Sequence, residues 1–488
     1  MNVATLKHEW FGNVRGDVLA GITVALALIP EAIAFSIIAG VDPMVGLYAS
    51  FCIAVVIAFT GGRPGMISAA TGAMAILMVT LVADHGIEYL FAATILTGII
   101  QILMGIFKLG KYISFLPQAV IIGFVNALAI LIFMTQLTHF TPEKGGSWIM
   151  VAFVAATLAI IYILPRFTRV LPSALVAIVV ITAIVVFGGG FGLSTVGDQG
   201  EITRALPMFH IPMVELSWEM FMIILPYAFT LALVGNLESL LTATIVDEMT
   251  DTKSNKNREM KGQGIANVVT GFFGGMAGCA MIGQSVINVK SGGRGRLSAL
   301  VAGVFLLFLI MVLGNIVIQI PMAALVGVMI MVSIGTFDWQ SLRELHRVPR
   351  ADAAVMLVTV GVVVYTHDLA KGVAAGVVLS AVVFGWKMAK IKAETVMEDS
   401  QKVYKIKGQM FFGTMSHFVD LFDYQNDPEH IVIDFSATHL WDQSAVTAVS
   451  KAILKYKKVG KTVTIIGLND ESKALINKIG LHAPTGHQ

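Results

Sequence analysis

The stretch GGMAGCAMIGQS, residues 274–285, combines strong apolar character with four glycines. Glycine is unfavourable inside a helix because it loses more conformational freedom on folding than any other residue. The stretch GGRPGMISAATG, residues 61–72, has the same GGxxG spacing in the first half of the chain. Two matched interruptions of apolar sequence therefore indicate that the chain consists of two related halves.

The composition places most of the chain in lipid. Of its 488 residues, 56% are hydrophobic and 13% are charged, and the mean hydropathy is +0.81. A water-soluble domain cannot bury this much apolar surface. Cys52 and Cys279 lie in apolar sequence and predict neither a disulfide nor a metal site. The polar start MNVATLKHEW precedes a long apolar stretch without a small-residue cleavage pattern, so we expect no cleaved signal peptide.

Apolar sequence continues from about Val18 to Trp386 and predicts fourteen membrane segments, several of them short. Their approximate centres are residues 29, 56, 76, 103, 127, 158, 180, 231, 268, 287, 308, 329, 358 and 377. Lys and Arg test this count because they concentrate in cytoplasmic loops. The loops after even-numbered segments are the basic ones, whereas the odd loops carry at most one such residue each, namely Lys144, Arg204 and Lys371. Both termini are therefore predicted to be cytoplasmic.

An odd number of segments in each half inverts the second half relative to the first. We therefore expect a 7+7 inverted repeat, over about residues 12–200 and 218–392, within a transmembrane domain of residues 1–392. Short helices interrupted by Gly or Pro at matching places of such repeats are typical of a transporter's substrate site.

The two glycine stretches predict helices that start inside the membrane. Non-helical backbone cannot face lipid, because each unpaired N–H or C=O there costs several kcal/mol. A helix start exposes free N–H groups and the positive end of the helix dipole, so two opposed starts can bind a small anion. The alternative is that these glycines only allow close helix packing. The predicted anion-binding residues are Ser68, Ala69, Ala70, Thr71, Gly72, Ala280, Met281, Ile282, Gly283, Gln284 and Ser285.

Two acidic residues lie inside the first apolar segment of each half, Glu31 and Glu238. A carboxylate within a membrane is costly and usually functional. Thr242 lies four residues after Glu238 and so shares its helix face. These oxygen ligands suit Na⁺, whereas a desolvated carboxylate can instead bind a proton. The coupling ion stays open, as does a purely structural role for either carboxylate.

From about residue 393 to residue 488 the sequence becomes charged and alternating, which predicts a separate cytoplasmic domain. Strands are predicted at Lys402–Ile406, Ile431–Phe435 and Thr462–Gly467, and helices at Ala445–Tyr456 and Asp470–Ile479. This alternation is typical of a small α/β unit. The chain has no HExxH, GxSxG or CxxC motif, so we expect neither enzymatic activity nor a cofactor other than bound Na⁺.

Several stretches resemble the sulfate permease (SulP) family of anion transporters, and their similarity covers nearly the whole chain. They are IPEAIAFSIIAGVDPMVGLYAS (29–50), LESLLTATIVDEMT (237–250), KSNKNREMKGQGIANVVTGFFGG (253–275) and KSGGRGRLS (290–298). In the C-terminal domain, IVIDFSATHLWDQSAV (431–446) resembles a STAS domain, the usual C-terminal partner in this family.

The resemblance implies a core domain and a gate domain, a homodimer, and elevator movement in the inner (plasma) membrane. It places the anion site between the starts of helices three and ten, here Ser68–Gly72 and Ala280–Ser285. In bicarbonate-transporting relatives, an acidic residue on helix eight binds Na⁺ together with a hydroxyl one turn later. The implied Na⁺ ligands of this chain are Glu238, Thr242, Ala280 and Ile282.

This chain departs from the family pattern at two of these positions. Glu238 stands where the bicarbonate-transporting relatives have Asp, which leaves the identity of the ion open. Gln284 stands where many members have Arg, so anion binding depends more on helix dipoles and on a co-bound cation. This substitution favours symport over exchange.

The sequence therefore predicts a secondary active transporter of a small inorganic oxyanion, bicarbonate or sulfate, coupled to Na⁺ or H⁺. One alternative is an anion exchanger or a channel-like transporter of chloride or dicarboxylates. Another is a membrane-anchored signalling platform in which the STAS domain is the working part. No nucleic acid is expected as a partner.

The STAS-like sequence also suggests regulation. In STAS domains that resemble bacterial anti-sigma antagonists, a phosphorylatable serine follows an Asp before a helix, and Asp442 and Ser444 match this pattern. The resemblance thus implies a phosphosite at Ser444 and a cytoplasmic regulatory partner. The alternative is that both residues only cap the helix.

Overall fold

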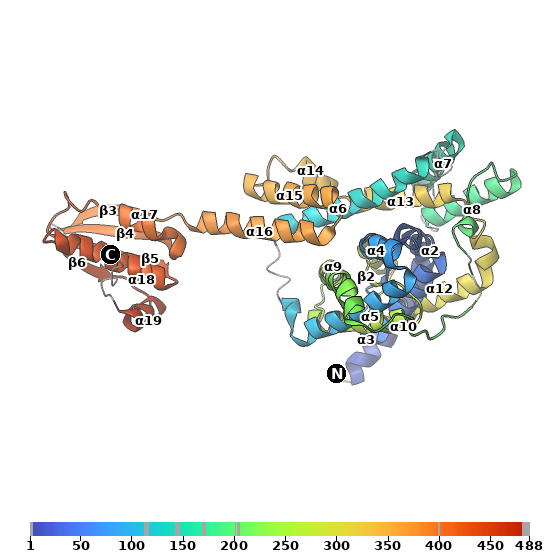
Figure 1. The fold of residues 1–488 in the computed structure, drawn as a ribbon, viewed down its shortest axis with the longest axis horizontal. Coiled ribbons are helices and arrows are strands. Elements are labelled where there is room, and N and C mark those ends of the chain that lie inside the picture. Colours follow the sequence, from blue (N-terminus) through green and yellow to red (C-terminus); the bar gives the residue numbers. More distant parts are fainter. Residues whose placement is uncertain are drawn as a thin grey trace. The chain divides into compact units, whose positions relative to one another are not determined.

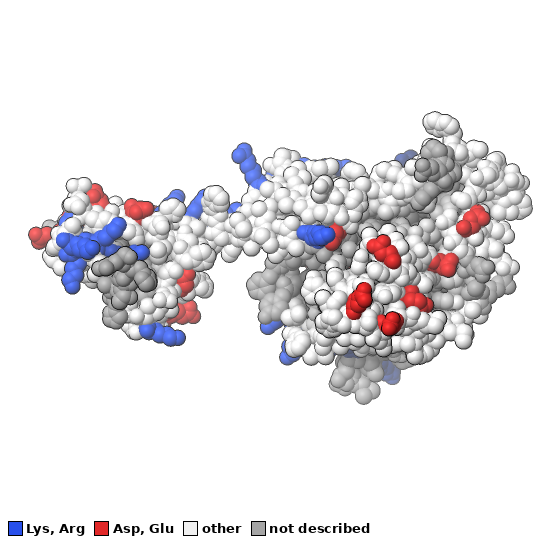
Figure 2. All heavy atoms as spheres, viewed as in Figure 1, with Lys and Arg blue, Asp and Glu red and all other residues white. Residues whose placement is uncertain are grey.

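The computed structural model describes residues 3–111, 117–141, 147–167, 172–200, 202, 205–398 and 401–480. It consists of two compact units, Met1–Val377 and Val378–Gln488. On the face shown in Figure 2, the surface of the first unit is largely uncharged, whereas the second unit carries charges of both signs. This difference matches a lipid-embedded unit and a water-exposed one.

The first unit is built of helices, whose labels follow Figure 1. The first half contains α1 (Val3–Phe11), α2 (Val14–Ala39), α3 (Pro43–Thr60), α4 (Gly72–His85), α5 (Ile87–Ile106), α6 (Gln118–Leu137), α7 (Trp148–Ile163) and α8 (Ser173–Phe187). The second half contains α9 (Trp218–Thr250), α10 (Lys256–Phe272), α11 (Ile282–Lys290), α12 (Arg296–Val317), α13 (Met322–Thr336), α14 (Trp339–Arg343), α15 (Arg350–Thr366) and α16 (Leu369–Met388). Short 3-10 turns are η2 (Thr138–Phe140), η4 (Leu164–Arg166) and η5 (Val196–Asp198).

Each of the predicted apolar segments coincides with one of these helices. Within the described residues, eight helices are long and apolar enough to cross a membrane, and α4, α8 and α13 are shorter apolar helices. The number of fourteen crossings stays a prediction. Helices α4 and α11 are short because each is preceded by extended chain rather than by helix.

The extended chain before these two helices forms a pair of short strands, one from each half. Strand β1 (Ser68–Ala70) pairs antiparallel with β2 (Gly278–Ala280), with Ser68 opposite Ala280 and Ala70 opposite Gly278. A Cβ atom at Gly278 would lie 2.1 Å from the carbonyl oxygen of Ala69, so only glycine allows this approach. The antiparallel pairing is the one that an inverted repeat requires.

The helices of the first unit pack in two groups (Figure 1). Helices α2–α5 pack with α9–α12, and we call these eight helices the core group. Helices α6–α8 pack with α13, while α15 packs on α6, and we call these five helices the gate group. The groups meet where α2 contacts α13 and where α4 contacts α6. The strand pair belongs to the core group, since β1 contacts α3 and β2 contacts α9.

The second unit has a four-stranded sheet in the order β3-β4-β5-β6, in which β3 and β4 are antiparallel and the other pairs are parallel. The strands are β3 (Lys392–Glu398), β4 (Gln401–Met410), β5 (His430–Leu440) and β6 (Thr462–Ile466). The helices are η6 (Phe412–Thr414), α17 (Met415–Asp420), α18 (Gln443–Lys458) and α19 (Asp470–Ile479). The three predicted strands and two predicted helices are confirmed, whereas the largely exposed strand β3 and the short α17 were not predicted.

Candidate functional site

Helices α4 and α11 both begin without a side-chain cap. The residues at their N-caps are Thr71 and Met281, and neither side chain accepts a hydrogen bond from its own helix. The first N–H groups bonded within the helices are those of Ala75, to the Thr71 oxygen at 2.9 Å, and of Ser285, to the Met281 oxygen at 3.0 Å. The N–H groups of residues 72–74 and 282–284 therefore have no partner in the helix and can bind an anion.

The space around the two helix starts differs. A Cβ atom built on Gly283 would have no heavy atom within 4 Å, so the first turn of α11 faces open space. A Cβ atom on Gly72 would lie 2.9 Å from Phe35 and 3.0 Å from Ile132, two buried side chains of α2 and α6. The start of α11 is thus open and the start of α4 is covered.

Gln284, in the first turn of α11, is bonded to an acidic residue of α2. Its Nε2 donates a hydrogen bond of 2.5 Å to Oε2 of Glu31, and both side chains are buried. A hydrogen bond to a carboxylate is stronger than one between neutral groups. The amide predicted to bind an anion is therefore already bonded to an acidic side chain of the same chain.

The second acidic residue, Glu238 of α9, reaches the strand pair through a cysteine. The Sγ atom of Cys279 in β2 donates a hydrogen bond of 2.9 Å to Oε2 of Glu238. On its other side the same sulfur lies 3.2 Å from Oγ1 of Thr71. The sequence did not indicate this role of Cys279, because only the pairing of β2 with β1 brings the thiol between these two residues.

The oxygen atoms near Glu238 suit a small hard cation. Thr242 lies one turn further along α9, and its hydroxyl donates to the backbone oxygen of Glu238 at 2.8 Å, which leaves its own lone pairs available. The hydroxyl of Ser239 accepts a hydrogen bond of 3.1 Å from the Ala280 N–H. Among the described residues, no group of three or more His, Cys, Asp or Glu side chains is arranged to hold a metal ion. A carboxylate with hydroxyl oxygens fits Na⁺ or a proton.

Two of the predicted residues hold the backbone of the strand pair. The Ser68 hydroxyl accepts a hydrogen bond of 2.7 Å from Nε2 of Gln263. The Ser285 hydroxyl accepts one of 3.0 Å from the Ile67 N–H, and the Met281 N–H donates to the Ile67 oxygen at 2.9 Å. These contacts fix the helix starts relative to each other.

The remaining predicted residues are Ala69, Ala70, Ala280 and Ile282. The N–H groups of two of them already have partners, since Ala70 donates to the Ser50 hydroxyl at 3.3 Å and Ala280 to that of Ser239 at 3.1 Å. The three alanines are buried within β1 and β2, and Ile282 is the first residue of α11.

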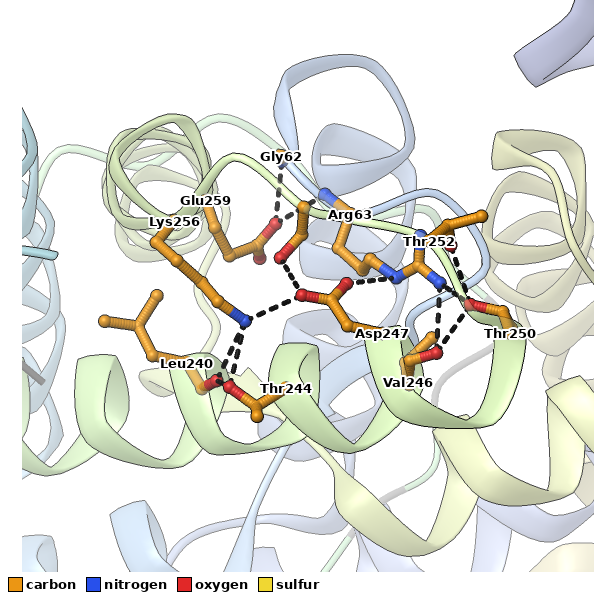
Figure 3. A network of polar contacts seen from close by, with 11 residues as sticks. Gly62, Arg63, Leu240, Thr244, Val246, Asp247, Thr250, Thr252, Lys256 and Glu259 are labelled. Carbon is orange, nitrogen blue, oxygen red and sulfur yellow. Dashed lines mark hydrogen bonds and ion pairs between the residues drawn. The ribbon is translucent and has the colours of Figure 1, made fainter. Parts of the chain in front are cut away.

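A polar network holds the turn that leads into β1 (Figure 3). The carboxylate of Glu259 in α10 accepts hydrogen bonds from the N–H groups of Gly62 and Arg63, at 2.7 and 3.1 Å. It also accepts one of 2.8 Å from Nε2 of Gln263. The Arg63 guanidinium is paired with Asp247 of α9 at 3.2 Å, and Lys256 contacts the same carboxylate at 3.1 Å. The lead-in to β1 is therefore fixed to α9 and α10 of the other half.

The end of α3 is fixed from the same side. Arg258 and Arg296 together donate hydrogen bonds to the last four carbonyl oxygens of this region, those of residues 58–61, at distances between 2.9 and 3.3 Å. These are the carbonyl groups that the end of a helix leaves without a partner. The sequence had suggested these arginines only as cytoplasmic loop charges.

Both parts of the chain match known protein families. The sulfate permease family matches residues 14–146 and 140–359, most of the helical unit. The chain belongs to the sulfate permease family. Residues 391–484 match the STAS domain, so this permease combines a membrane unit with a C-terminal STAS domain.

Relatives of this chain cover nearly its full length. YbaR from Bacillus subtilis (strain 168), a protein named for sulfate transport, is 60% identical over 98% of this chain and 99% of its own. The bicarbonate transporter BicA from Picosynechococcus is 28% identical over 96% of this chain and 92% of its own. The chain is therefore a multi-pass membrane protein of a family that contains sulfate and bicarbonate transporters.

Solved structures agree with this assignment. The transmembrane domain of a cyanobacterial BicA has a TM-score of 0.67 and 29% identity, covering 75% of this permease and 98% of that chain. The murine Solute Carrier 26 member A9 anion transporter, in an inward-facing state, has a TM-score of 0.82 at 18% identity and covers 96% of this chain and 87% of its own. The second likeness shows the fold alone.

The structure places Ser444 in the first turn of α18 of the STAS domain. Asp442 is the N-cap of that helix and accepts hydrogen bonds from Ala445 N at 2.9 Å and from Phe412 N at 2.8 Å. Asp442 is thus a helix cap, and phosphorylation of Ser444 stays a prediction.

Proposed function

We propose that this sulfate permease is a secondary active transporter of a small inorganic oxyanion, bicarbonate or sulfate, driven by symport with Na⁺ or H⁺. The observation that carries the proposal is the convergence of two uncapped helix starts and a buried carboxylate on one strand pair. The names of the relatives YbaR and BicA support these two anions as the first candidates.

A cation at Glu238 would make up for the missing positive side chain at the start of α11. Gln284 is neutral, and its amide donates to the carboxyl group of Glu31. An anion that enters here meets helix dipoles and N–H groups, but ionised carboxylates nearby would repel it. Binding of Na⁺ or H⁺ at Glu238 removes one of these negative charges, so anion and cation should bind cooperatively.

The two helix groups provide the moving parts of this mechanism. The proposed anion site would lie in the core group, and the gate group packs against this group through α2–α13, α4–α6 and α2–α8. We propose that the core group moves past the gate group as an elevator, in a homodimer in the inner (plasma) membrane with both termini in the cytoplasm. We also propose that the STAS domain binds a cytoplasmic regulatory partner.

Uptake into proteoliposomes tests the proposal. Labelled bicarbonate, sulfate, succinate and chloride are offered under a Na⁺ gradient, under a proton gradient and under neither. We expect uptake of bicarbonate or sulfate that depends on one of the two gradients and is lost in Glu238→Gln. Glu248→Gln is the matched control, because Glu248 lies on the same helix α9 and is exposed.

Three results would contradict the proposal. Gradient-independent anion uptake by the wild type would indicate an exchanger, and a large anion conductance in planar bilayers would indicate a channel. Full gradient-driven uptake by a well-expressed Glu238→Gln variant would exclude the coupling role of Glu238. Loss of uptake only on removal of the STAS domain, with Glu238→Gln unaffected, would favour a signalling platform.

A further inference from the structure

We propose that the Cys279 thiol is a positioning residue that links cation binding at Glu238 to the donor state of the Thr71 hydroxyl at the start of α4. This inference rests on the proposed cation-coupled transport and names the atoms that connect its two sites.

The three residues form one short hydrogen-bonded chain across three elements. Glu238 lies on α9, Cys279 on β2 and Thr71 at the N-cap of α4. The thiol is 2.9 Å from the carboxylate and 3.2 Å from the hydroxyl, and Cys279 is fully buried. Among the residues that the structure describes, Cys279 is the side chain hydrogen-bonded to both Glu238 and Thr71, so a change at Glu238 reaches Thr71 through this sulfur.

The conformation of Thr71 supports this role. A threonine at an N-cap normally accepts a hydrogen bond from the second or third N–H of its own helix. Thr71 makes no such bond although it has the extended backbone of an N-cap, and its hydroxyl contacts Cys279 instead. The Thr71 hydroxyl is therefore engaged with the thiol, and the first N–H groups of α4 have no side-chain cap.

The charge of Glu238 determines which groups donate in the hydrogen bonds that join Glu238, Cys279 and Thr71. An ionised carboxylate only accepts hydrogen bonds, so the thiol donates to it and the Thr71 hydroxyl in turn donates to sulfur. A carboxylic acid donates instead, and a bound Na⁺ attracts the lone pairs of sulfur. In either case the thiol hydrogen turns toward Thr71, whose own hydrogen is then free to point at an anion. These changes are rotations about the C–S and C–O bonds, and no covalent bond is broken.

The neighbouring polar residues do not provide a second hydrogen-bonded path from Glu238 to Thr71. Among the described residues, Cys279 is the ionisable side chain that is hydrogen-bonded to Glu238. The other acidic residue of the site, Glu31 on α2, is held by Gln284 of α11. Ser239 and Thr242 on α9 bond to backbone atoms, of Ala280 and Glu238 respectively, and neither connects to α4.

The test measures how strongly the driving cation changes the KM for the anion. The probe is labelled bicarbonate and labelled sulfate in proteoliposomes, with KM determined at saturating cation and without it, for Na⁺ and for H⁺ separately. The variants are Cys279→Ala, which removes the link, and Cys279→Ser, which keeps one donor and two lone pairs. Cys52→Ala is the control, because Cys52 is the other buried cysteine and lies on α3 rather than on β2.

We expect the wild type and Cys52→Ala to show a KM that falls at least about fivefold when the cation is added, the lower end of typical coupling between sites. In Cys279→Ala, the ratio of KM without cation to KM with cation should fall below roughly twofold while the protein still transports. Cys279→Ser should restore most of this ratio. A merely structural role of the thiol would change kcat or stability and leave the ratio intact.

The outcomes separate this inference from the function on which it rests. A full cation effect in Cys279→Ala, or no restoration in Cys279→Ser when both variants are folded, overturns the thiol link and leaves the coupled transport standing. A wild type whose KM is unaffected by either cation overturns both. If Cys279→Ala does not fold, Thr71→Val removes the hydroxyl that contacts the thiol. This variant must then lower the ratio of KM without cation to KM with cation in the same way.

Discussion

The starts of α4 and α11 occupy equivalent places in the two halves but present different surfaces. Both lack a side-chain cap and both follow a strand of the same β pair. Gly72 is packed against Phe35 and Ile132, whereas Gly283 borders open space. The covered start contributes a hydroxyl that is bonded to the cation side, and the open start contributes the surface that an anion can reach.

The two halves also differ in how their strands are held. The turn before β1 depends on the charged side chains Glu259, Arg258 and Arg296, all from the second half. The start of β2 is held by a neutral amide, since Asn267 bonds both the N–H and the oxygen of Gly278, at 2.9 and 3.0 Å. The inverted repeat therefore supplies the same backbone path twice, and different side chains stabilise each copy.

The largest expected effect is that of Glu259→Leu, which removes the partner of two buried backbone N–H groups and of Gln263. Each buried group left unpaired costs about 1–3 kcal/mol, so we expect a loss of stability of about 3 kcal/mol or more. The thermal unfolding midpoint of the purified full chain measures it. Glu248→Leu, at an exposed position, should leave the midpoint unchanged, and equal midpoints for the two variants would show that the network in Figure 3 does not hold β1.

The next effect is the contrast between the two glycines. Gly72→Leu should lower stability by about 1–3 kcal/mol, because the added side chain must displace Phe35 and Ile132. Gly283→Leu should leave the unfolding midpoint within error of the wild type, because its side chain enters open space. If the two variants were equally destabilised, the distinction between a covered and an open helix start would be wrong.

Gly283→Leu, which should not change stability, should weaken anion binding. Gly283→Leu places an apolar side chain over the N–H groups of residues 282–284, so the dissociation constant for the transported anion should rise at least about tenfold, or 1.4 kcal/mol. Gly361→Leu is the matched control, because Gly361 of α15 is also helical and also has open space beside it. An unchanged affinity in a folded Gly283→Leu variant argues against an anion site at the start of α11.

The smallest effect concerns Glu31. Glu31→Gln keeps an oxygen acceptor for Gln284 but replaces the carboxyl group beside the open helix start. We expect the anion to bind roughly fivefold tighter, because an amide oxygen competes less strongly than the carboxyl group for the Gln284 amide, a difference of about 1 kcal/mol. Direct binding of labelled bicarbonate or sulfate measures it, and weaker binding would mean that Glu31 assists the anion rather than competes with it.

Much of the fold could be predicted because hydropathy and glycine spacing carry the information. The apolar segments, the positions where α4 and α11 begin, and the α/β character of the STAS domain all follow from local sequence patterns. Strand β3 could not be predicted, because the charged sequence KAETVME has neither a run of apolar residues nor a buried face. Its pairing with β4 is what defines it.

The site was predictable only in part, for a different reason. The matched glycine stretches and the intramembrane carboxylates pointed to the residues, but not to their partners. That Gln284 binds Glu31, that Ser68 binds Gln263 and that Cys279 lies between Glu238 and Thr71 depends on contacts between residues far apart in the chain. Sequence periodicity contains no signal for such pairs.

The measurement that tests the central claim most directly is the rate at which an anionic methanethiosulfonate labels Gly283→Cys with and without bicarbonate or sulfate. The native cysteines are buried, so labelling should report on position 283. An anion bound at the start of α11 predicts that the transported anion slows labelling at least about fivefold, a change typical of linked binding, and leaves Gly361→Cys unaffected. Rapid labelling that neither anion slows would contradict an anion site between the two helix starts.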